Sequence, residues 1–213
     1  MFLLIVSSDA DLLYAWRAGD TVAGQQLFKR YYAGVARFFA NKLQEAPGDL
    51  VQETFMGCVE GRDRIREGGS FRSYLFGVAY RVLTSHLRRK YNAPDDLGSS
   101  TVRDFDPGPS TLMHRSEEAH LLLQALRSLP VQLQVLIELR YWEQMNSAEI
   151  SHVLGIPANT VRGRLRQGRI MLEEALETMA AAPELVHNTL SDLEGWAQQV
   201  REALPLPRSQ PPS

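Results

Sequence analysis

The sequence predicts an all-α protein with two small helical domains, a flexible acidic linker between them, a helix-turn-helix in the second domain and a C-terminal helical extension. Three observations lead to this fold class. Apolar residues recur at helical spacing through most of the chain, and runs of alternating β-branched residues are nearly absent. In the middle of the chain, prolines, glycines, serines and aspartates replace the apolar residues that a core would need.

The composition limits the size of each predicted domain. The chain has 213 residues, of which 44% are apolar, so two small domains would each bury only a modest core. We expect an N-terminal domain over residues 1–91, a linker over 92–113, a C-terminal domain over 114–179 and the extension over 180–213.

Four helices are expected in the N-terminal domain. Asp9 is the expected cap of the first helix, Asp49 starts the third, and Ser70 caps the fourth. Turns that contain glycine separate the first three helices, and a charged, glycine-rich loop precedes the last. The second, third and fourth helices are expected to span residues 22–43, 49–61 and 71–90.

The linker and the C-terminal helices follow from a change in composition. The linker contains four aspartates and few apolar side chains to offset the entropy of ordering, which predicts flexibility. The C-terminal domain is expected to form helices over 117–129 and 132–143, and a longer pattern over 147–177 that Gly155 interrupts. In the extension, a helical pattern over 184–204 has Leu190, Leu193, Trp196 and Val200 on one face.

Cysteine and histidine usage argues against a metal site or a catalytic site. Cys58 is the single cysteine, which excludes an internal disulfide and a cysteine-based zinc site. Its apolar neighbours favour a buried structural thiol over a reactive one. The five histidines are scattered along the chain rather than grouped. We therefore expect no metal, no cofactor and no catalytic residue, and we do not expect an enzyme.

The N-terminus and the net charge bear on location and partners. The first six residues are apolar, but they lack a basic leader and are too few for a signal peptide or a membrane span. We therefore expect a soluble, cytoplasmic protein without membrane contact. The formal net charge is −2, whereas free-standing DNA-binding proteins are usually basic. Any contact with nucleic acid should therefore be local, or assisted by a larger partner.

The strongest motif is a helix-turn-helix over residues 146–172. Ser147 is expected to cap its first helix, and Gly155 supplies the tight turn. Asn159 or Thr160 is expected to cap its second helix. Glycine at the turn and polar residues at the caps occur together here, which favours the motif over two unrelated helices.

The second helix of this motif has an apolar face and a basic face. Val161, Leu165 and Ile170 are expected to pack on the core, and no acidic residue occurs between 157 and 172. The alternative is an ordinary helical hairpin with a solvated basic face. We expect the first turns to enter the major groove of duplex DNA. The expected contacts there are Asn159, Thr160, Arg162, Arg164, Arg166 and Gln167.

The sequence DLVQETF at residues 49–55 is the second motif. Asp49, Gln52 and Glu53 share one face of a predicted helix. No histidine, cysteine pair or glycine-rich loop accompanies the carboxylates, which argues against catalysis. From spacing alone, a solvated amphipathic helix explains the motif better than an acidic docking face for a basic protein.

The third motif is the helix expected over residues 71–90, in which arginines lie beside aromatic residues. Cations suit phosphates and flat rings suit unpaired bases, so this pattern favours a single-stranded nucleic acid. The loop before it is flexible enough to close over an extruded base. Aromatic residues at these positions also suit a core, and the two interpretations remain equally supported. The pattern alone places Arg72, Tyr80, Arg81, Ser85, Arg88 and Arg89 on the surface beside the core stripe.

Together these motifs resemble the extracytoplasmic-function (ECF) sigma factors, the smallest type of bacterial sigma subunit. The resemblance covers about residues 9–177 and depends on DLVQETF, SYLFGVAYRVLTSHLRRK and LPVQLQVLIELRYWEQMNSAEISHVLGIPANTVRGRLRQGRIML. The order of the three segments and the linker between the last two also match. A single helix-turn-helix is common to many regulators, but all three segments in order are much more specific.

The resemblance implies a role for each motif. Asp49, Gln52 and Glu53 would contact the clamp coiled coil of the largest subunit of core RNA polymerase. The loop and helix at the third motif would melt the −10 element and capture a flipped base, and the helix-turn-helix would recognise the −35 element. The residues that the resemblance implies on the −10 side are Arg66, Ser70, Arg72, Ser73, Tyr80 and Arg81. The implied partners are core polymerase (through its clamp coiled coil and flap), promoter DNA as duplex and as melted strand, and an inhibitor. The inhibitor would be an anti-sigma factor or the chain's own helix at 183–204.

Two features depart from the family pattern. Gly163 lies inside the predicted recognition helix, where glycine costs about 1 kcal/mol relative to alanine. It would permit close approach of the backbone to a phosphate or to the neighbouring helix. The extension over 180–213 exceeds the family minimum, and its apolar face needs a partner surface.

Two other functions compete with a sigma factor. The first is a helix-turn-helix transcriptional regulator without initiation activity, which needs neither DLVQETF nor the third motif. The second is a protein-interaction module that binds a signalling partner through its N-terminal helices.

Overall fold

The structure is a computed structural model that describes residues 7–43, 47–65, 70–91 and 117–179. Every regular element within those ranges is helical, as the sequence predicts. The predicted linker lies outside the described residues, and so does the extension with its expected helix.

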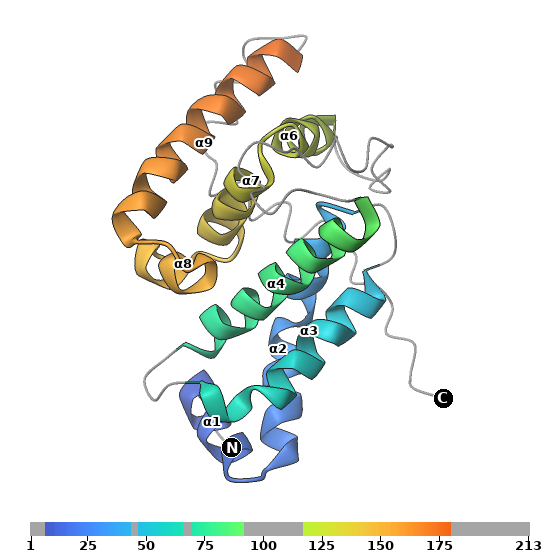
Figure 1. Cartoon of the computed structure of the whole chain (residues 1–213), viewed down its shortest axis with the longest axis vertical. Coiled ribbons are helices and arrows are strands. Elements are labelled where there is room, and N and C mark those ends of the chain that lie inside the picture. The colour runs from blue at the N-terminus through green and yellow to red at the C-terminus, as the bar shows by residue number, and fades with distance from the viewer. Residues whose placement is uncertain (1–6, 44–46, 66–69, 92–116, 180–213) are drawn as a thin grey trace, which may run out of the picture.

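Within its described residues, the N-terminal half contains four α-helices and one short 3-10 turn. The helices are α1 (Asp9–Arg17), α2 (Thr21–Ala40), α3 (Gly48–Glu60) and α4 (Phe71–Tyr91), and the turn is η1 (Arg62–Arg64). All four helices were expected, with boundaries that differ by a few residues. The four helices form the lower part of the molecule in Figure 1.

The cap of α1 differs from the prediction. Ser8, not Asp9, is the N-cap, and its hydroxyl accepts a hydrogen bond from the Asp11 backbone N–H at 3.2 Å. The Asp11 carboxylate accepts one from the Ser8 backbone N–H at 3.0 Å, which completes a capping box. Asp9 is freed for long-range contacts and pairs with Arg30 and Tyr31 of α2.

Over residues 117–179, the described part of the C-terminal half, there are four α-helices and one π-helical turn. The elements are α6 (Glu117–Arg127), α7 (Val131–Ile137), the π turn η2 (Glu138–Trp142), α8 (Ser147–Leu154) and α9 (Ala158–Met179). The single helix expected over 132–143 therefore changes from α to π geometry halfway along its length. Such π turns occur frequently at functional sites.

The turn of the helix-turn-helix is confirmed, but its expected caps are wrong. Gly155 has φ of 67°, the left-handed conformation that glycine adopts readily. Asn146 caps α8 in place of Ser147, because it forms a capping box with Glu149. Helix α9 begins at Ala158, so Asn159 and Thr160 lie inside its first turn.

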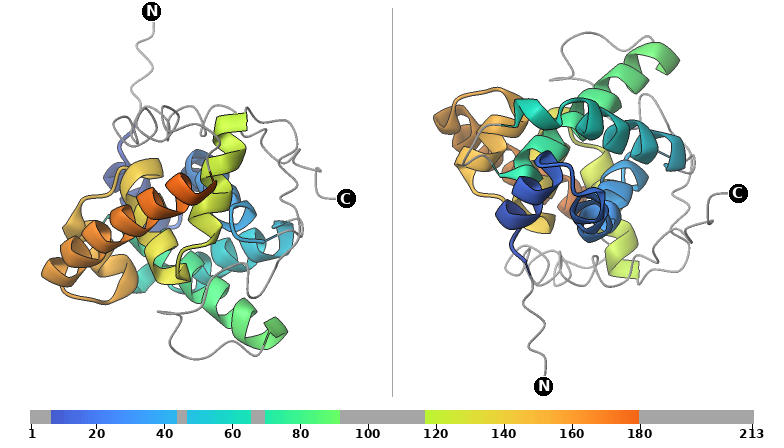
Figure 2. Two further views of the ribbon diagram at one scale, coloured as in Figure 1. Left: turned by 90° about the horizontal axis from the view of Figure 1, so that it is seen from above. Right: turned by 90° about the horizontal axis from the view of Figure 1, so that it is seen from below.

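The two halves pack against each other along α4 and α8, and their buried side chains form one continuous hydrophobic core. Figure 1 shows this stacking from the side, and Figure 2 looks along the long axis, with the C-terminal helices nearer the viewer on the left and the N-terminal helices nearer on the right. The backbones of α4 and α8 come close at Gly77, where an added Cβ would lie 3.8 Å from the Val153 Cα of α8. Among the described helices, none is both long enough and apolar enough to cross a membrane.

Candidate nucleic-acid and protein interfaces

The three predicted docking residues lie together on the exposed face of α3. Asp49, Gln52 and Glu53 line a groove of about 790 Å³ between α3 and α4. The opposite wall includes Arg81, one of the residues expected to contact a melted strand. Glu53 also forms an exposed ion pair, at 3.6 Å, with Arg89 farther along α4. The docking residues and part of the predicted strand-binding set therefore share one groove.

A second groove, between α2 and α3, is apolar, and the sequence analysis did not identify it. Its volume is about 830 Å³, and Phe28, Tyr32 and Phe55 line it. Met56 and Val59 extend it to the surface, where they are 54% and 47% exposed. Apolar residues four positions apart on both helices were a usable signal, but such spacing also indicates an ordinary core face.

Of the residues expected to contact a melted strand, Ser70 and Arg81 are exposed and Tyr80 is partly buried against the core. Arg66 lies outside the described residues. Phe71 and Phe76, aromatic residues of the same helix, are 1% and 0% exposed, so for these two the core interpretation holds.

Arg72 and Ser73 of the same set face the C-terminal half. Arg72 donates one hydrogen bond to the Glu143 carbonyl at 3.0 Å and another to the Glu149 carboxylate at 2.5 Å. Ser73 is 6% exposed. In this arrangement the Ser73 side chain is buried, and both terminal nitrogens of Arg72 already donate to acceptors of the C-terminal half.

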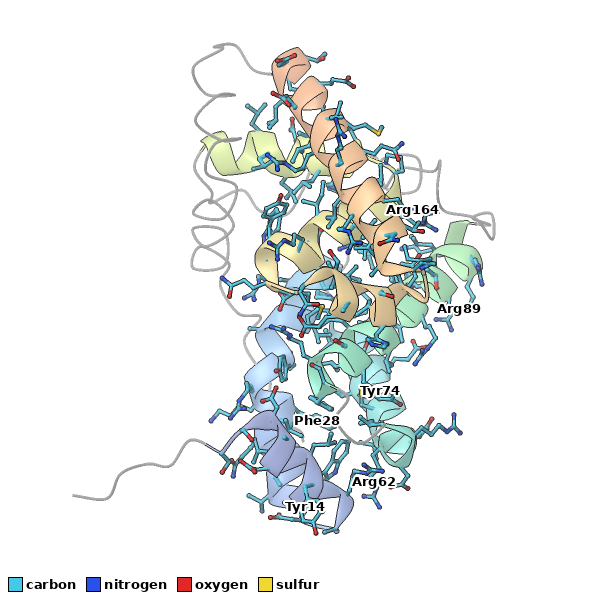
Figure 3. All side chains as sticks on the ribbon, turned by 90° about the vertical axis from the view of Figure 1, so that its left-hand side faces the viewer. Tyr14, Phe28, Arg62, Tyr74, Arg89 and Arg164 are labelled. Atoms are coloured by element: carbon cyan, nitrogen blue, oxygen red, sulfur yellow. The ribbon has the colours of Figure 1, made fainter. Side chains whose placement is uncertain are left out.

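Tyr74 was not predicted, and it shapes the first groove. Its hydroxyl lies where a side chain on Gly61 would be, only 1.9 Å from an added Cβ. Burial is the main cause that raises the pKa of Tyr74. Figure 3 shows Tyr74 on α4 above Arg62 of the η1 turn. Glycine at position 61 is therefore required for the tyrosine to lie there.

The basic face of α9 is confirmed as a surface. Asn159, Arg162, Arg166 and Gln167 are exposed, and Asn159 accepts a hydrogen bond from Arg162. Thr160 is partly buried.

Arg164, labelled in Figure 3, differs from the other arginines of α9. It is partly buried and donates to the Gln132 side-chain oxygen at 2.6 Å. Part of its hydrogen-bonding capacity is therefore already used within the C-terminal half.

The expected core face of α9 is partly wrong. Val161 is buried and Leu165 packs against the core, but Ile170 is 48% exposed. At about 100° per residue, position 170 lies on the side of the helix opposite to position 161. Gly168 and Leu172 lie on the same side as Val161 and are buried in its place.

Two residues of the η2 turn extend the basic surface of α9. Arg140 and Tyr141 line a groove of about 550 Å³ together with Arg162, Arg166 and Arg169. Their position in a helix that looked purely structural hid them from the sequence analysis. Gly163 is exposed and a Cβ there would meet nothing within 4 Å, so the suggested approach to a neighbouring helix is wrong.

Comparison with known proteins matches both halves to parts of one family. The family model of Sigma-70 region 2 matches residues 26–92, and that of Sigma-70, region 4 matches residues 119–172. Together they cover more than half of the chain.

No group of three His, Cys, Asp or Glu residues suited to a metal ion occurs in the described part of the chain.

Two relatives that match over nearly their whole length are also sigma factors. The ECF RNA polymerase sigma-E factor of Haemophilus influenzae is 24% identical over 184 residues, which cover 81% of this chain and 97% of the relative. The RNA polymerase sigma-H factor of Pseudomonas aeruginosa is 25% identical over 191 residues, which cover 83% and 98%.

Two solved structures share the fold. CnrH in complex with the cytosolic domain of CnrY has a TM-score of 0.59 at 22% identity, with 82% of this chain and 100% of that chain covered. The sigma factor RpoE in complex with the anti-sigma factor NepR from Bartonella quintana has a TM-score of 0.54 at 18% identity, with coverage of 72% and 96%.

The fold and the two matched regions define a sigma-70-type transcription initiation factor. Within that class, the chain belongs to the ECF sigma factors of RNA polymerase. The regulator without initiation activity is not favoured, because such a protein would need no region 2.

Proposed function

We propose that the N-terminal half binds core RNA polymerase through Asp49, Gln52 and Glu53 and holds the melted −10 strand against α4. The C-terminal half binds the −35 element through α9. The observation that supports this proposal most is that acidic and basic side chains are exposed on two different surfaces of the protein. An acidic face on α3 is exposed at one place, and an arginine face on α9 is exposed at another.

Duplex binding by α9 follows from its geometry and charge. An exposed helix N-terminus with arginines fits the major groove, where arginine recognises guanine and also binds phosphates. We assign phosphate contacts to Arg140 and Arg169 as well, because they flank Arg162 and Arg166 in one groove.

The overall charge supports a need for polymerase. Opening a duplex costs roughly 1.4 kcal/mol per base-pair step. A chain with a formal net charge of −2 has little excess positive charge to hold the opened strands. We propose that polymerase supplies the positive channel, while this subunit selects the sequence and acts in the cytoplasm without catalysis of its own.

An inhibitory partner is part of the proposal. RpoE in the solved structure is in complex with the anti-sigma factor NepR. We propose that this chain is also held inactive by a protein partner until a signal releases it.

The test is transcription with purified core polymerase on a library of genomic fragments. We expect RNA from a limited set of promoters that share one −10 and one −35 sequence, and none from core polymerase alone. Absence of promoter-specific RNA at every fragment, despite stable folding of the chain, would contradict the proposal.

A further inference from the structure

Helices α7 and α9 cross in close contact, and Gly168 of α9 lies at the crossing. An added Cβ on Gly168 would lie 3.2 Å from the Ile137 Cδ1 and 3.6 Å from the Leu133 Cβ of α7. A side chain at position 168 would therefore crowd α7. The close crossing brings the first turn of α7 beside the N-terminal half of α9.

Gln132, a residue of that first turn of α7, holds an arginine of α9. Arg164 lies about one helical turn before Gly168, and its Nη1 donates to the Gln132 Oε1 at 2.6 Å. An arginine has donors and no acceptor, so the amide turns its oxygen towards Arg164. Both side chains are partly buried, so neighbouring atoms restrict the rotamers of the pair.

Arg164 lies on a different flank of α9 from the other arginines. At about 100° per residue, Arg162 lies about 100° from the buried Val161 in one direction around the helix, and Arg164 lies about 60° from it in the other. Arg166 and Arg169 lie on the Arg162 side, where they line one groove with the η2 turn. The cations of α9 therefore occupy both flanks, one beside η2 and the other beside α7.

The two flanks of a recognition helix face the two phosphate strands of the DNA. An α-helix is about 10–12 Å across with its side chains, and the major groove is about 12 Å wide, so a helix in the groove lies close to both strands. Asn159 and Gly163 are exposed on the face opposite Val161, which faces the base edges. Arg164, held at Gln132 on the flank, lies beside the strand on the α7 side.

We propose that Gln132 is a positioning residue for DNA binding, which holds Arg164 so that the remaining guanidinium nitrogens bind a phosphate of the strand beside α7. This inference rests on the proposed function and adds a residue outside the recognition helix. Fixing the guanidinium before binding reduces the rotamer entropy that is lost when the phosphate is bound. A phosphate contact sets affinity and register, but it carries no direct sequence information.

Binding of upstream promoter DNA to the holoenzyme formed with core polymerase tests this assignment. The probe is a labelled duplex that contains the −35 element of a promoter found in the transcription test and ends before the −10 element, so melting contributes nothing. A duplex with a scrambled −35 element is measured beside it. Each dissociation constant is measured from about 50 to 200 mM salt, for Gln132→Leu, Arg164→Met and the double variant.

We expect Gln132→Leu to weaken binding about threefold to tenfold on both duplexes, because a phosphate contact is lost whatever the sequence. The preference for the −35 duplex should stay within about twofold of the wild type, and the salt slope should become shallower by up to about 0.9. In the Arg164→Met background, Gln132→Leu should have no further effect, because Gln132 acts through Arg164. A merely structural role of Gln132 would leave the salt slope unchanged.

Two comparisons keep the test decisive. Gln25→Leu, which removes an exposed glutamine from α2, is the matched control and should bind as the wild type does. Arg164→Met removes the same bond from the other side and should show the same change in salt slope, which tests the contact even if Gln132→Leu does not fold.

The outcomes separate this inference from the proposed function. Wild-type affinity and salt slope in the folded Gln132→Leu variant overturn the inference alone, and so do additive effects of the two substitutions. Loss of the preference for the −35 duplex in Gln132→Leu also overturns it, because Arg164 would then recognise a base. A wild-type holoenzyme that binds neither duplex overturns the proposed function, and the inference with it.

Discussion

Two sets of charged residues differ in their surroundings: the Lys42–Glu138 ion pair between the two halves, and the arginines on the outer face of α9. Lys42 and Glu138 are buried and bonded to each other, whereas Arg162 and Arg166 are exposed on the surface. Removal of one member of a buried ion pair leaves the other charge buried without a partner, which destabilises the fold. An exposed arginine is available to bind a ligand such as a phosphate. The comparison teaches that the burial of a charged side chain, more than its type, separates structural charges from functional ones.

The largest expected effect concerns the buried ion pair between Lys42 and Glu138. Lys42→Met leaves the Glu138 carboxylate buried without its cation, which should lower the free energy of unfolding by about 3–5 kcal/mol. Urea denaturation of the full chain measures this loss. The double variant Lys42→Met with Glu138→Met removes both charges and should recover most of it. Equal stability of the single variant and the wild type would show that the pair is not buried in solution.

The outer face of α9 should respond in the opposite way. Arg166→Ala should weaken binding to a duplex that contains the −35 element by about 1–3 kcal/mol if the arginine recognises a base. Stability should change by less than about 0.5 kcal/mol, because the residue is exposed. Fluorescence anisotropy with labelled duplex measures the affinity. Glu174→Ala, exposed farther along the same helix, is the matched control and should bind as the wild type does.

The acidic face of α3 should show a smaller effect. Glu53→Ala removes one exposed carboxylate from the proposed docking face, and exposed pairs contribute about 0.2–1 kcal/mol. We therefore expect up to about fivefold weaker binding to core polymerase, and an effect that shrinks as salt is raised. Asp63→Ala, an exposed carboxylate on the η1 turn, is the control. Equal losses in both variants would argue against a specific docking face on α3.

The smallest expected signal comes from Cys58. Its thiol is 0% exposed, and burial raises its pKa to about 12, so little thiolate forms near neutral pH. A thiol reagent at pH 8 should modify the folded chain far more slowly than the urea-unfolded chain. Rapid modification of the folded chain would show that α3 opens locally, which would also weaken the assignment of its outer face.

Predictions that depend only on neighbouring residues of the chain were mostly confirmed. Gly155 was placed at its turn, and Asp49, Gln52 and Glu53 were placed on one exposed face, because helical spacing alone decides both. The error at Ile170 arose within a helix, from an apolar residue assigned to the wrong side. Which of two neighbouring polar residues caps a helix was also mispredicted, since Ser8 and Asp9 are both good caps.

The ion pairs between the two halves were not predicted, because their residues look ordinary in the sequence. Lys42 follows the end of α2, where a solvated cation is the usual expectation. Its partner Glu138 is 96 positions farther along the chain. Arg72 was expected on a free surface, yet it pairs with Glu149 of the other half. Helical spacing describes each helix separately and carries no information about which charged residues of different helices pair.

The sequence by itself determined the helical fold class, the two family regions and the basic face of α9, since these depend on residue order and helical period. The tertiary structure alone decided which charges are paired and which are exposed. Burial and pairing depend on neighbours that the folded chain brings together from distant positions.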